Sequence, residues 1–212
     1  IGHIVKMNLK RIVDSKIGNA DIALFFKNKP IRIDVLSNLN PDFYAPILIN
    51  SGVAWKQNDK NKFNVQIIGI NDQFNKFRQT TVEYRNFKGA VAEINKIFAE
   101  KCAIKQGDEL IVWVKNISSS LLNIPYISDE NSVVPLKLKV VNILDNTELG
   151  NFSLDNSQTL PFNIFVPIDF LSEKMGIKDS ANLILTRDAD ENIVRRHIYN
   201  LSLYTHLTLP TK

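Results

Sequence analysis

Two apolar segments joined by a wholly polar connection constrain the fold of this 212-residue chain more than any other feature. In residues 63–70, apolar Phe63 and Val65 alternate with polar residues, which is the period of a strand with one buried face. Residues 47–55 form the other apolar segment, and every residue in the connection 56–62 is polar. The pattern predicts a β-hairpin, because two such segments bury their apolar faces most simply by pairing.

Around this hairpin the sequence predicts a mixture of helices and strands. Helices are expected at residues 1–17, 30–39, 88–103 and 167–175, with a last one beginning at Asp188. Strands are expected at residues 21–27, 109–115, 136–140, 162–166 and 182–185. Gly18 and Gly176 each follow a helix as a C-cap. The Ser- and Asn-rich residues 117–134 predict a long loop, and the order of elements predicts an α+β fold.

The composition is that of a folded protein without a membrane-spanning segment. Hydrophobic residues make up 44% of the chain and charged residues 23%, so the sequence is not that of a disordered protein. No apolar run reaches eighteen residues, so nothing in this piece spans a bilayer. The formal net charge of +4 is spread along the chain and does not indicate a particular partner.

No residue pattern indicates an enzyme. His3 and His197 do not have a metal-ligand spacing, and Cys102 stands on the apolar face of the helix expected at residues 88–103. No nucleophile elbow and no Gly-rich phosphate loop is present. We therefore expect no catalytic residues and no cofactor.

Asp188, Asp190 and Asn192 have the spacing of the first ligands in a calcium-binding loop. The sixth position, however, is Ile193 instead of Gly, and the twelfth is Tyr199 instead of Glu. Helix capping explains these acids better, so we expect no metal site here.

Basic and aromatic residues cluster in one third of the chain, which is typical of a stacking platform for nucleic acid. The cations are Lys56, Lys60, Lys62, Lys76, Arg78, Arg85 and Lys88, and the aromatic residues are Phe74, Phe77, Tyr84 and Phe87. Acidic residues are interspersed and no recognition motif accompanies the cluster. A solvated hairpin and loop is therefore the preferred interpretation, and no nucleic acid is expected as a partner.

Several segments, in order along the chain, resemble the extracytoplasmic domain of FtsX-type ABC-transporter permeases. Residues 17–24, IGNADIAL, are similar to the segment that follows the first membrane helix of that family, and residues 65–74 to its recurrent strand and turn. Residues 92–110 resemble the family's helix, Gly-Asp turn and strand. LGNFSL at 149–154 and PFNIFVP at 161–167 are typical of permeases with a MacB-like periplasmic core domain.

The resemblance implies a porter-like mixed α/β subdomain with a second, mainly β lobe, placed outside the bacterial inner membrane. Residues 1–17 would then be an amphipathic helix leading from a membrane span, 18–116 the porter-like subdomain, and 117–200 the mainly β lobe. The closing residues 204–212 resemble a translated sequencing adapter, so we exclude residues 201–212 as a non-native tail.

The family's activity implies coupling of cytoplasmic ATP hydrolysis to the handling of a substrate or partner outside the membrane. The implied partners are a cytoplasmic ABC ATPase, a second permease in a homodimer, and a periplasmic cargo or adaptor protein. The cargo is not readable from the sequence. The alternative is a free-standing protein that binds nucleic acid or an envelope ligand.

The loop at residues 117–134 contains apolar residues in an otherwise polar setting and is the candidate partner contact. Those residues are Leu121, Leu122, Ile124, Pro125 and Tyr126. The alternative is that they pack onto the core of the domain itself.

Overall fold

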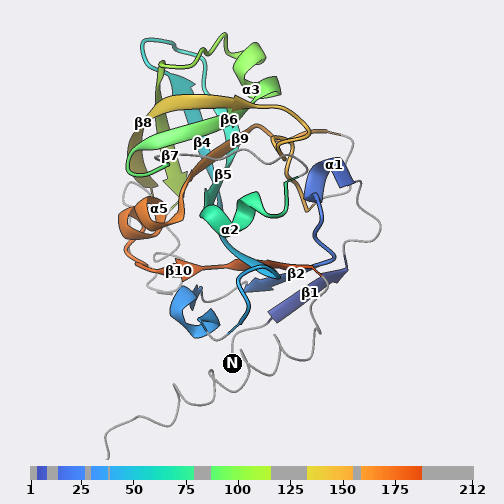
Figure 1. Ribbon diagram of the computed structural model, residues 1–212. Helices are drawn as coiled ribbons and strands as arrows, with labels where there is room; N and C mark the ends of the chain where they lie inside the picture. Colours follow the sequence, from blue (N-terminus) through green and yellow to red (C-terminus); the bar gives the residue numbers. More distant parts are fainter. Residues whose placement is uncertain are drawn as a thin grey trace, which may run out of the picture.

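The computed structural model describes residues 4–8, 14–26, 30–37, 39–78, 87–115, 133–154 and 159–187. Strands β4 (Tyr44–Lys56) and β5 (Phe63–Ile70) pair as the expected antiparallel hairpin, with Leu48 opposite Gly69 and Ala54 opposite Phe63. The hairpin is the start of a larger closed structure that occupies the upper part of Figure 1.

Six strands close into a barrel. Around the ring, β5 pairs with β9 (Asn163–Pro167), and β9 pairs with β6 (Val91–Asn95). Strand β6 then pairs with β8 (Val133–Leu144), and β8 pairs with β7 (Glu109–Lys115). The ring closes where β7 pairs with β4. The pairs β5–β9 and β6–β8 are parallel and the other four are antiparallel. Each strand therefore has a partner on both sides within the ring.

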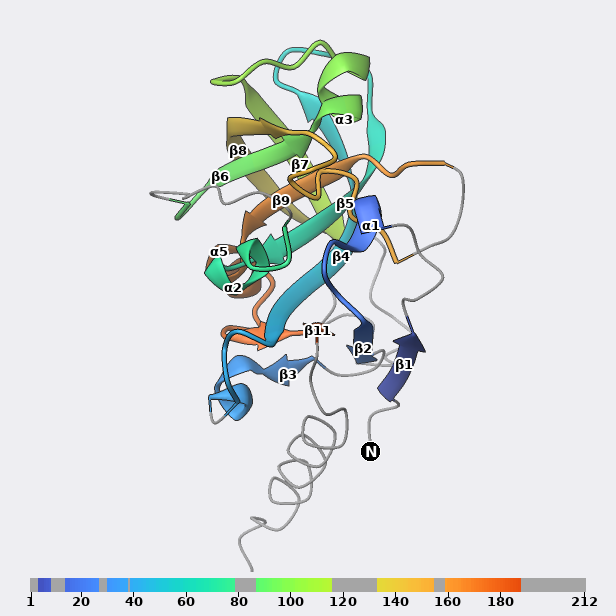
Figure 2. The same cartoon turned by 45° about the vertical axis from the view of Figure 1, so that its right-hand side comes forward.

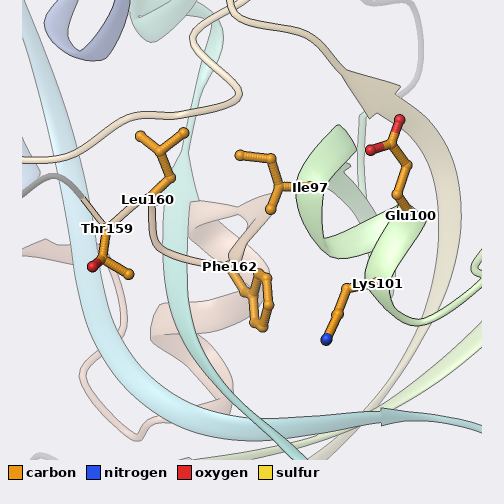
Figure 3. A pocket seen from close by; sticks show the side chains of 6 residues that line it. All are labelled: Ile97, Glu100, Lys101, Thr159, Leu160 and Phe162. Carbon is orange, nitrogen blue, oxygen red and sulfur yellow. The ribbon is translucent and has the colours of Figure 1, made fainter.

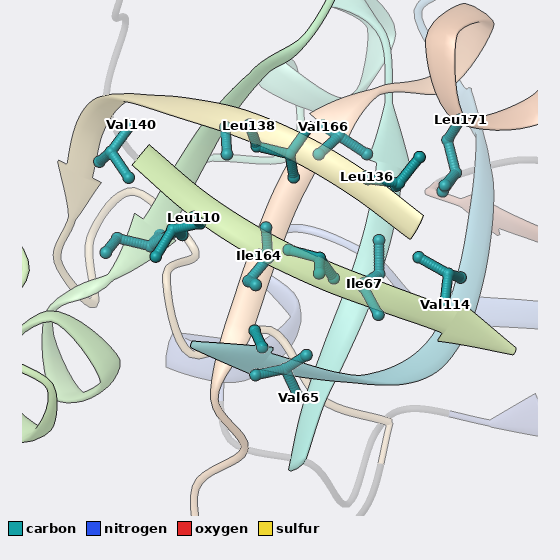
Figure 4. Packing of buried hydrophobic residues seen from close by; sticks show 14 of the residues in the cluster. Val65, Ile67, Leu110, Val114, Leu136, Leu138, Val140, Ile164, Val166 and Leu171 are labelled. Atoms are coloured by element: carbon teal, nitrogen blue, oxygen red, sulfur yellow. The ribbon is translucent and has the colours of Figure 1, made fainter. Parts of the chain in front are cut away.

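Alternate residues of the six strands fill the barrel with aliphatic side chains (Figure 4). Leu110, Val112 and Val114 of β7 point inward between exposed or half-buried neighbours, and β8 shows the same alternation. Gly52 of β4 faces the same interior, where an added Cβ would lie 2.7 Å from the Ile67 side chain. The interior is thus a packed hydrophobic core with a small residue where the strands approach most closely.

Two short helices add to this core. Helix α5 (Ile168–Lys174) packs closely on β5, since a Cβ at Gly69 would lie 3.1 Å from Leu171. Helix α3 (Lys96–Lys101) contributes Phe98, whose ring lies 6.3 Å from that of Phe63 and 5.3 Å from that of Phe162. The helix expected at residues 167–175 is confirmed, and so is its end at Gly176, which has φ +69°.

A smaller sheet extends from the first half of β4. There β4 pairs with β11 (Leu183–Thr186), β11 with β2 (Ile22–Phe26), and β2 with β1 (Ile4–Asn8), all antiparallel. This extension lies at the lower end of Figures 1 and 2. The long strand β4 is therefore shared by the sheet and the barrel.

Both faces of the extension are covered by short elements. Leu36 of the 3-10 helix η1 (Ile33–Leu36) packs with Leu24 and Tyr44 on one face, next to the two-stranded sheet of β3 (Ile31–Arg32) and β10 (Ser180–Ala181). On the other face, α1 (Asp14–Ile17) contributes Ile17 to a second core, α2 (Asp72–Asn75) contributes Phe74, and the turn after α2 contributes Phe77.

Three helical expectations are wrong. Residues 31–36, expected within a helix over residues 30–39, form the strand β3 and the 3-10 helix η1, because Ile31 and Arg32 pair with β10. Residues 4–8, expected within a helix over residues 1–17, form β1, because the edge of β2 offers backbone partners along all five residues. Residues 91–95, expected within a helix over 88–103, form β6, and only Lys96–Lys101 are helical. Four of the five β6 residues are buried, since the strand lies between β8 and β9 and loses the alternation that marks a half-buried strand.

The expected α+β class is confirmed as a mixed and mostly β fold. The strands on either side of residues 116–132 pair with each other from Glu109–Lys139 to Lys115–Val133. Strands β7 and β8 thus lie on opposite sides of the predicted boundary at residue 117 and pair with each other. The predicted domain limits stay a prediction. No helix among the described residues is long and apolar enough to cross a membrane.

Candidate functional site

The expected contact residues Leu121, Leu122, Ile124, Pro125 and Tyr126 lie outside the described residues, as do His3, His197 and the acids from Asp188 onward. Among the described residues, the turn around α2 contacts several segments that lie far apart in the sequence. We define the α2 junction as residues 71–78 together with the residues that contact them.

The local sequence explains the turn. Asn71 caps α2, with its side-chain oxygen accepting a hydrogen bond from the backbone N–H of Gln73 at 3.2 Å. Phe74 and Phe77 are fully buried, because the short helix lies between the outside of the barrel and the smaller sheet. The ring of Phe74 lies 5.9 Å from that of Phe165 on β9, which fixes α2 against the barrel.

The segment after α1 contacts the junction through its backbone. The N–H of Asn19 donates a hydrogen bond to the carbonyl of Phe77 at 3.1 Å. Gly18 has φ +59°, and an added Cβ would lie only 1.9 Å from the same carbonyl oxygen. Glycine is therefore required here both by backbone conformation and by space, and the helix end expected at Gly18 is confirmed.

The end of β11 reaches the same turn from the other side. The Arg187 guanidinium donates hydrogen bonds to the carbonyls of Lys76 at 3.0 Å and Asp42 at 3.1 Å. It also lies 5.7 Å from the centre of the Phe77 ring. Lys76 forms an ion pair with the Asp42 side chain, and this hydrogen-bonded pairing lowers the pKa of that carboxyl. The early and late parts of the described chain therefore meet at α2.

A buried ion pair ties the junction to the barrel. Arg78 donates a hydrogen bond to Glu93 on β6 at 3.1 Å, and both side chains are essentially inaccessible to solvent. Burial raises the pKa of Glu93, while the charge and hydrogen bond of Arg78 act in the opposite direction. Breaking such a pair leaves an uncompensated charge in the interior, which is unfavourable. The Arg78–Glu93 pair therefore holds the turn after α2 against β6.

The segments with the closest family resemblance form a polar network at the end of β9. The Asn163 side chain donates hydrogen bonds to the carbonyls of Gly150 and Phe152, both at 2.9 Å. The Asn95 side chain accepts from the backbone N–H of Asn163 at 3.0 Å and donates to the carbonyl of Pro161 at 2.9 Å. These buried asparagines hold the 149–154 turn on the barrel, which gives that motif a structural role.

The 149–154 turn also contacts the end of α1 and the glycine that follows it. The N–H of Ser153 donates to the carbonyl of Lys16 at 3.2 Å, and a Cβ at Gly18 would lie 3.1 Å from Leu149. The ring of Phe152 lies 5.7 Å from that of Phe74. The α2 junction thus connects α1, β6, β9, β11 and the 149–154 turn. The sequence alone missed it, although the Gly18–Asn19 helix end and the 149–154 motif each mark part of it.

The basic and aromatic cluster does not form a stacking platform in the part of the chain that the structure describes. Phe74 and Phe77 are buried, and Arg78 is paired with Glu93. Lys56 and Lys76 form ion pairs with Asp108 and Asp42, respectively. The absence of a nucleic-acid partner stays a prediction.

Enzyme-like groups do not assemble among the described residues. Cys102 is buried, and burial raises the pKa of its thiol to about 11, so it is not an activated nucleophile. No group of three or more His, Cys, Asp or Glu that could hold a metal is present within those residues. A shallow, open depression of about 680 Å³ lies beside α3 (Figure 3). It is lined by Ile97, Glu100, Lys101, Thr159, Leu160 and Phe162.

Comparison with known proteins finds likeness at the level of structure. No protein-family model and no curated sequence matches the chain. The extracellular domain of the noncanonic ABC-type transporter YknZ from Gram-positive bacteria is similar, with a TM-score of 0.51 and 16% identity, over 84% of each chain. The periplasmic region of MacB from Actinobacillus actinomycetemcomitans is similar too, with a TM-score of 0.53 and 11% identity, over 92% of this chain and 88% of that one.

One neighbour is an extracellular domain and the other a periplasmic region, and both match along most of their own length. At these identities the likeness concerns the fold. The chain therefore has the fold of the YknZ extracellular domain and the MacB periplasmic region, which confirms the resemblance drawn from its sequence.

Proposed function

We propose that this chain is the extracytoplasmic domain of an ABC-transporter permease and that it transmits movement instead of performing chemistry. In this role, closure of a cytoplasmic ABC ATPase moves membrane helices, and those helices move the domain outside the inner membrane. The porter-like arrangement of a mixed subdomain with a mainly β lobe is part of this proposal, as is pairing of two permeases.

The observation that carries the proposal is the convergence of early and late chain segments on α2. Asn19 bonds to the carbonyl of Phe77, and Arg187 bonds to the carbonyl of neighbouring Lys76. The strand after Asn19, β2, and the strand before Arg187, β11, also pair directly with each other. Membrane helices joined to the two ends of such a domain would act on one sheet and one turn.

From α2 two contacts lead to the barrel. Arg78 is paired with buried Glu93 on β6, and Phe74 packs against Phe165 on β9. A displacement of the smaller sheet relative to α2 would therefore be passed to the barrel as a body. Substrate or partner handling, including export or lipoprotein release, would then follow from rigid-body movement outside the membrane.

The location is testable by thiol labelling. Asn61 is exposed in the β4–β5 connection, and the native Cys102 is buried, so the variant Asn61→Cys presents one accessible thiol among the described residues. In cells producing the intact gene product, a membrane-impermeant maleimide should label Asn61→Cys without lysis. Labelling only after lysis would contradict an extracytoplasmic location.

The coupling role needs a second measurement. Arg187→Gln should keep the domain folded but weaken coupling, measured as transport or complementation at equal protein level. Lys178→Gln, an exposed lysine near β10, is the matched control and should leave coupling unchanged. Full coupling in Arg187→Gln would remove the α2 junction from the mechanism while leaving the location intact.

The free-standing binding protein remains the rival function. It requires a gene without apolar segments of about 20 residues on either side of this piece. Sequencing the intact gene separates the two, because a permease requires such segments and an ATPase partner.

A further inference from the structure

The outer face of the barrel carries an apolar patch that the packing of the domain does not use. We define the tryptophan face as six outward side chains on β4, β7 and β8: Val53, Trp55, Ile111, Trp113, Val133 and Pro135. Trp113 is 41% exposed and Val133 39%, and among the large apolar side chains described only Phe43 is comparably exposed. Such a cluster is more than the scattered apolar exposure of an ordinary surface.

The strand register assembles this face from distant parts of the sequence. Trp113 stands opposite Val53 on one side and Pro135 on the other, while Ile111 stands opposite Trp55 in the next row. The two tryptophan rings meet edge to face, with centroids 5.1 Å apart and planes at 86°. Because the rings hold each other in place, little side-chain entropy remains to be lost on binding.

The charges around the face are mostly positive. Lys62 lies over both rings, with its Nζ 4.6 Å from the centre of Trp113 and 5.0 Å from that of Trp55. Exposed lysines also stand in the outward rows of β7 and β8, at Lys115, Lys137 and Lys139. The acidic residue of these rows is Glu109, which pairs with Lys137 at 3.0 Å. An apolar centre with a basic rim is complementary to an apolar anchor among carboxylates.

Two other kinds of occupant fit the geometry less well. A strand cannot add to these strands, because β4 and β8 flank β7 on both sides along the face. A flat sugar ring would have to stack where Lys62 already covers the indoles.

The position of the face also argues against a membrane surface. Val53 and Trp55, the β4 residues of the tryptophan face, lie about eight residues from the part of β4 that pairs with β11. This separation corresponds to ~26 Å along an extended strand. Figure 1 shows the smaller sheet of β1, β2 and β11 at the opposite end from the barrel. If the membrane lies at the end that carries β1 and β11, as the proposed function requires, the tryptophan face lies far from it along β4.

We propose that the tryptophan face is a docking surface for a second protein that presents an apolar anchor surrounded by carboxylates. Trp113 and Trp55 form its apolar centre, and the four lysines of the rim select the acidic partner and accelerate encounter. The position of the tryptophan face far from the membrane rests on the proposed function, whereas the chemistry of the face does not.

The first measurement asks whether the face is open in the free protein. The chain contains only two tryptophans, both on this face, so intrinsic fluorescence reports on it directly. Acrylamide should quench the emission of the purified chain efficiently, as for a partly exposed indole. Quenching as weak as that of a fully buried tryptophan would mean that the chain itself covers the face, which overturns the proposal.

The second measurement titrates the chain with a short synthetic peptide that carries a Leu-Phe pair flanked by glutamates. We expect a shift of the tryptophan emission that weakens as salt is raised, because the rim charges are screened. A peptide with lysines in place of the glutamates should bind far more weakly. No shift with the acidic peptide, equal shifts with both peptides, or a response only to phosphatidylglycerol vesicles would each overturn the proposal.

Matched charge reversals locate the site. Lys62→Glu and Lys139→Glu should each weaken binding of the acidic peptide by about fivefold or more. Lys178→Glu changes the same charge at an exposed position outside the barrel face and should leave binding unchanged. Equal losses in all three variants would indicate a nonspecific charge effect and refute a defined surface. These tests need no membrane, so their failure is distinct from failure of the thiol labelling.

Discussion

The side chain of Asn182 replaces a strand partner for Ile49. Its amide oxygen accepts a hydrogen bond from the Ile49 N–H and its amide nitrogen donates one to the Ile49 carbonyl, both at 2.8 Å. This occurs where β4 stops pairing with β11 and has not yet begun to pair with β7. One side chain thus keeps β4 continuous between the smaller sheet and the barrel.

Asn182→Leu should therefore destabilise the domain by about 3 kcal/mol, because two backbone groups of Ile49 lose their partner. Urea unfolding followed by circular dichroism measures the change. Asn50→Ala is the control, since Asn50 makes a solvent-exposed bond to the Lys115 carbonyl and its loss should cost less than about 1 kcal/mol. Equal costs would mean that Asn182 has no special role at the switch.

Gly18→Ala should be strongly destabilising, whereas Gly176→Ala should be mild. Both glycines have a left-handed φ, +59° and +69°, but only Gly18 has the Phe77 carbonyl where a Cβ would go. The conformation alone costs about 1 kcal/mol, and the steric conflict raises the cost at Gly18 to about 3 kcal/mol or more. Thermal unfolding of both variants measures the difference. Similar losses would show that α1 can move away from α2 without penalty.

Removing one partner of the buried ion pair should cost more than removing both. Glu93→Gln leaves the Arg78 charge uncompensated in the interior and should destabilise by about 3–5 kcal/mol. The double variant Arg78→Leu, Glu93→Leu removes both charges and should recover most of that loss. Chemical unfolding of the single and double variants gives the coupling energy. A purely additive result would contradict a mutually dependent pair.

The same pair predicts a pH dependence of stability. Burial raises the pKa of Glu93 above its ordinary value of 4.5, so the folded state holds this proton more tightly than the unfolded state. The contribution of Glu93 to stability is therefore largest below pH 4.5 and declines as pH rises through the folded-state pKa. Unfolding free energies measured across this range should fall less steeply in Glu93→Gln than in the unaltered chain. An identical slope would contradict the raised pKa.

Cys102 should be inert in the folded protein. With a pKa of about 11, only about one thiol in a thousand is ionised at pH 8, and the side chain is also buried. Reaction with a colourless aromatic disulfide should be very slow until denaturant is added, and then fast. A fast reaction without denaturant would mean that α3 opens readily, and it would complicate the labelling of Asn61→Cys.

Local sequence patterns predicted the hairpin of β4 and β5 and the strand β7. Strand β5 follows from the alternation of Phe63 and Val65 with polar residues, whereas β4 and β7 follow from apolar segments rich in strand-forming residues. The β6 segment could not be predicted in this way, because Ala92, Glu93 and Ile94 are all buried. The spacing of Ile94 and Phe98, which suggested one helix, instead spans a strand and the helix after it.

The α2 junction depends on contacts that no local pattern encodes. Phe74 and Phe77 appeared to belong to a surface cluster because lysines and arginines surround them in sequence. Their burial comes from β9, β11 and the 149–154 turn, which lie far along the chain. Resemblance to a family supplied what periodicity could not, namely which solved structures the chain is similar to. The tryptophan face became visible only once the strand register placed Trp55 beside Trp113.

Closure of the barrel also bears on aggregation. A sheet whose last strand returns to one of its own members leaves few unpaired backbone groups for another molecule to recruit. Among the described strands of this large sheet, β1 is the end strand that pairs on one side only. The route to fibrils that this sheet leaves open is therefore detachment of β1, which would uncover the equally long and wholly apolar strand β2.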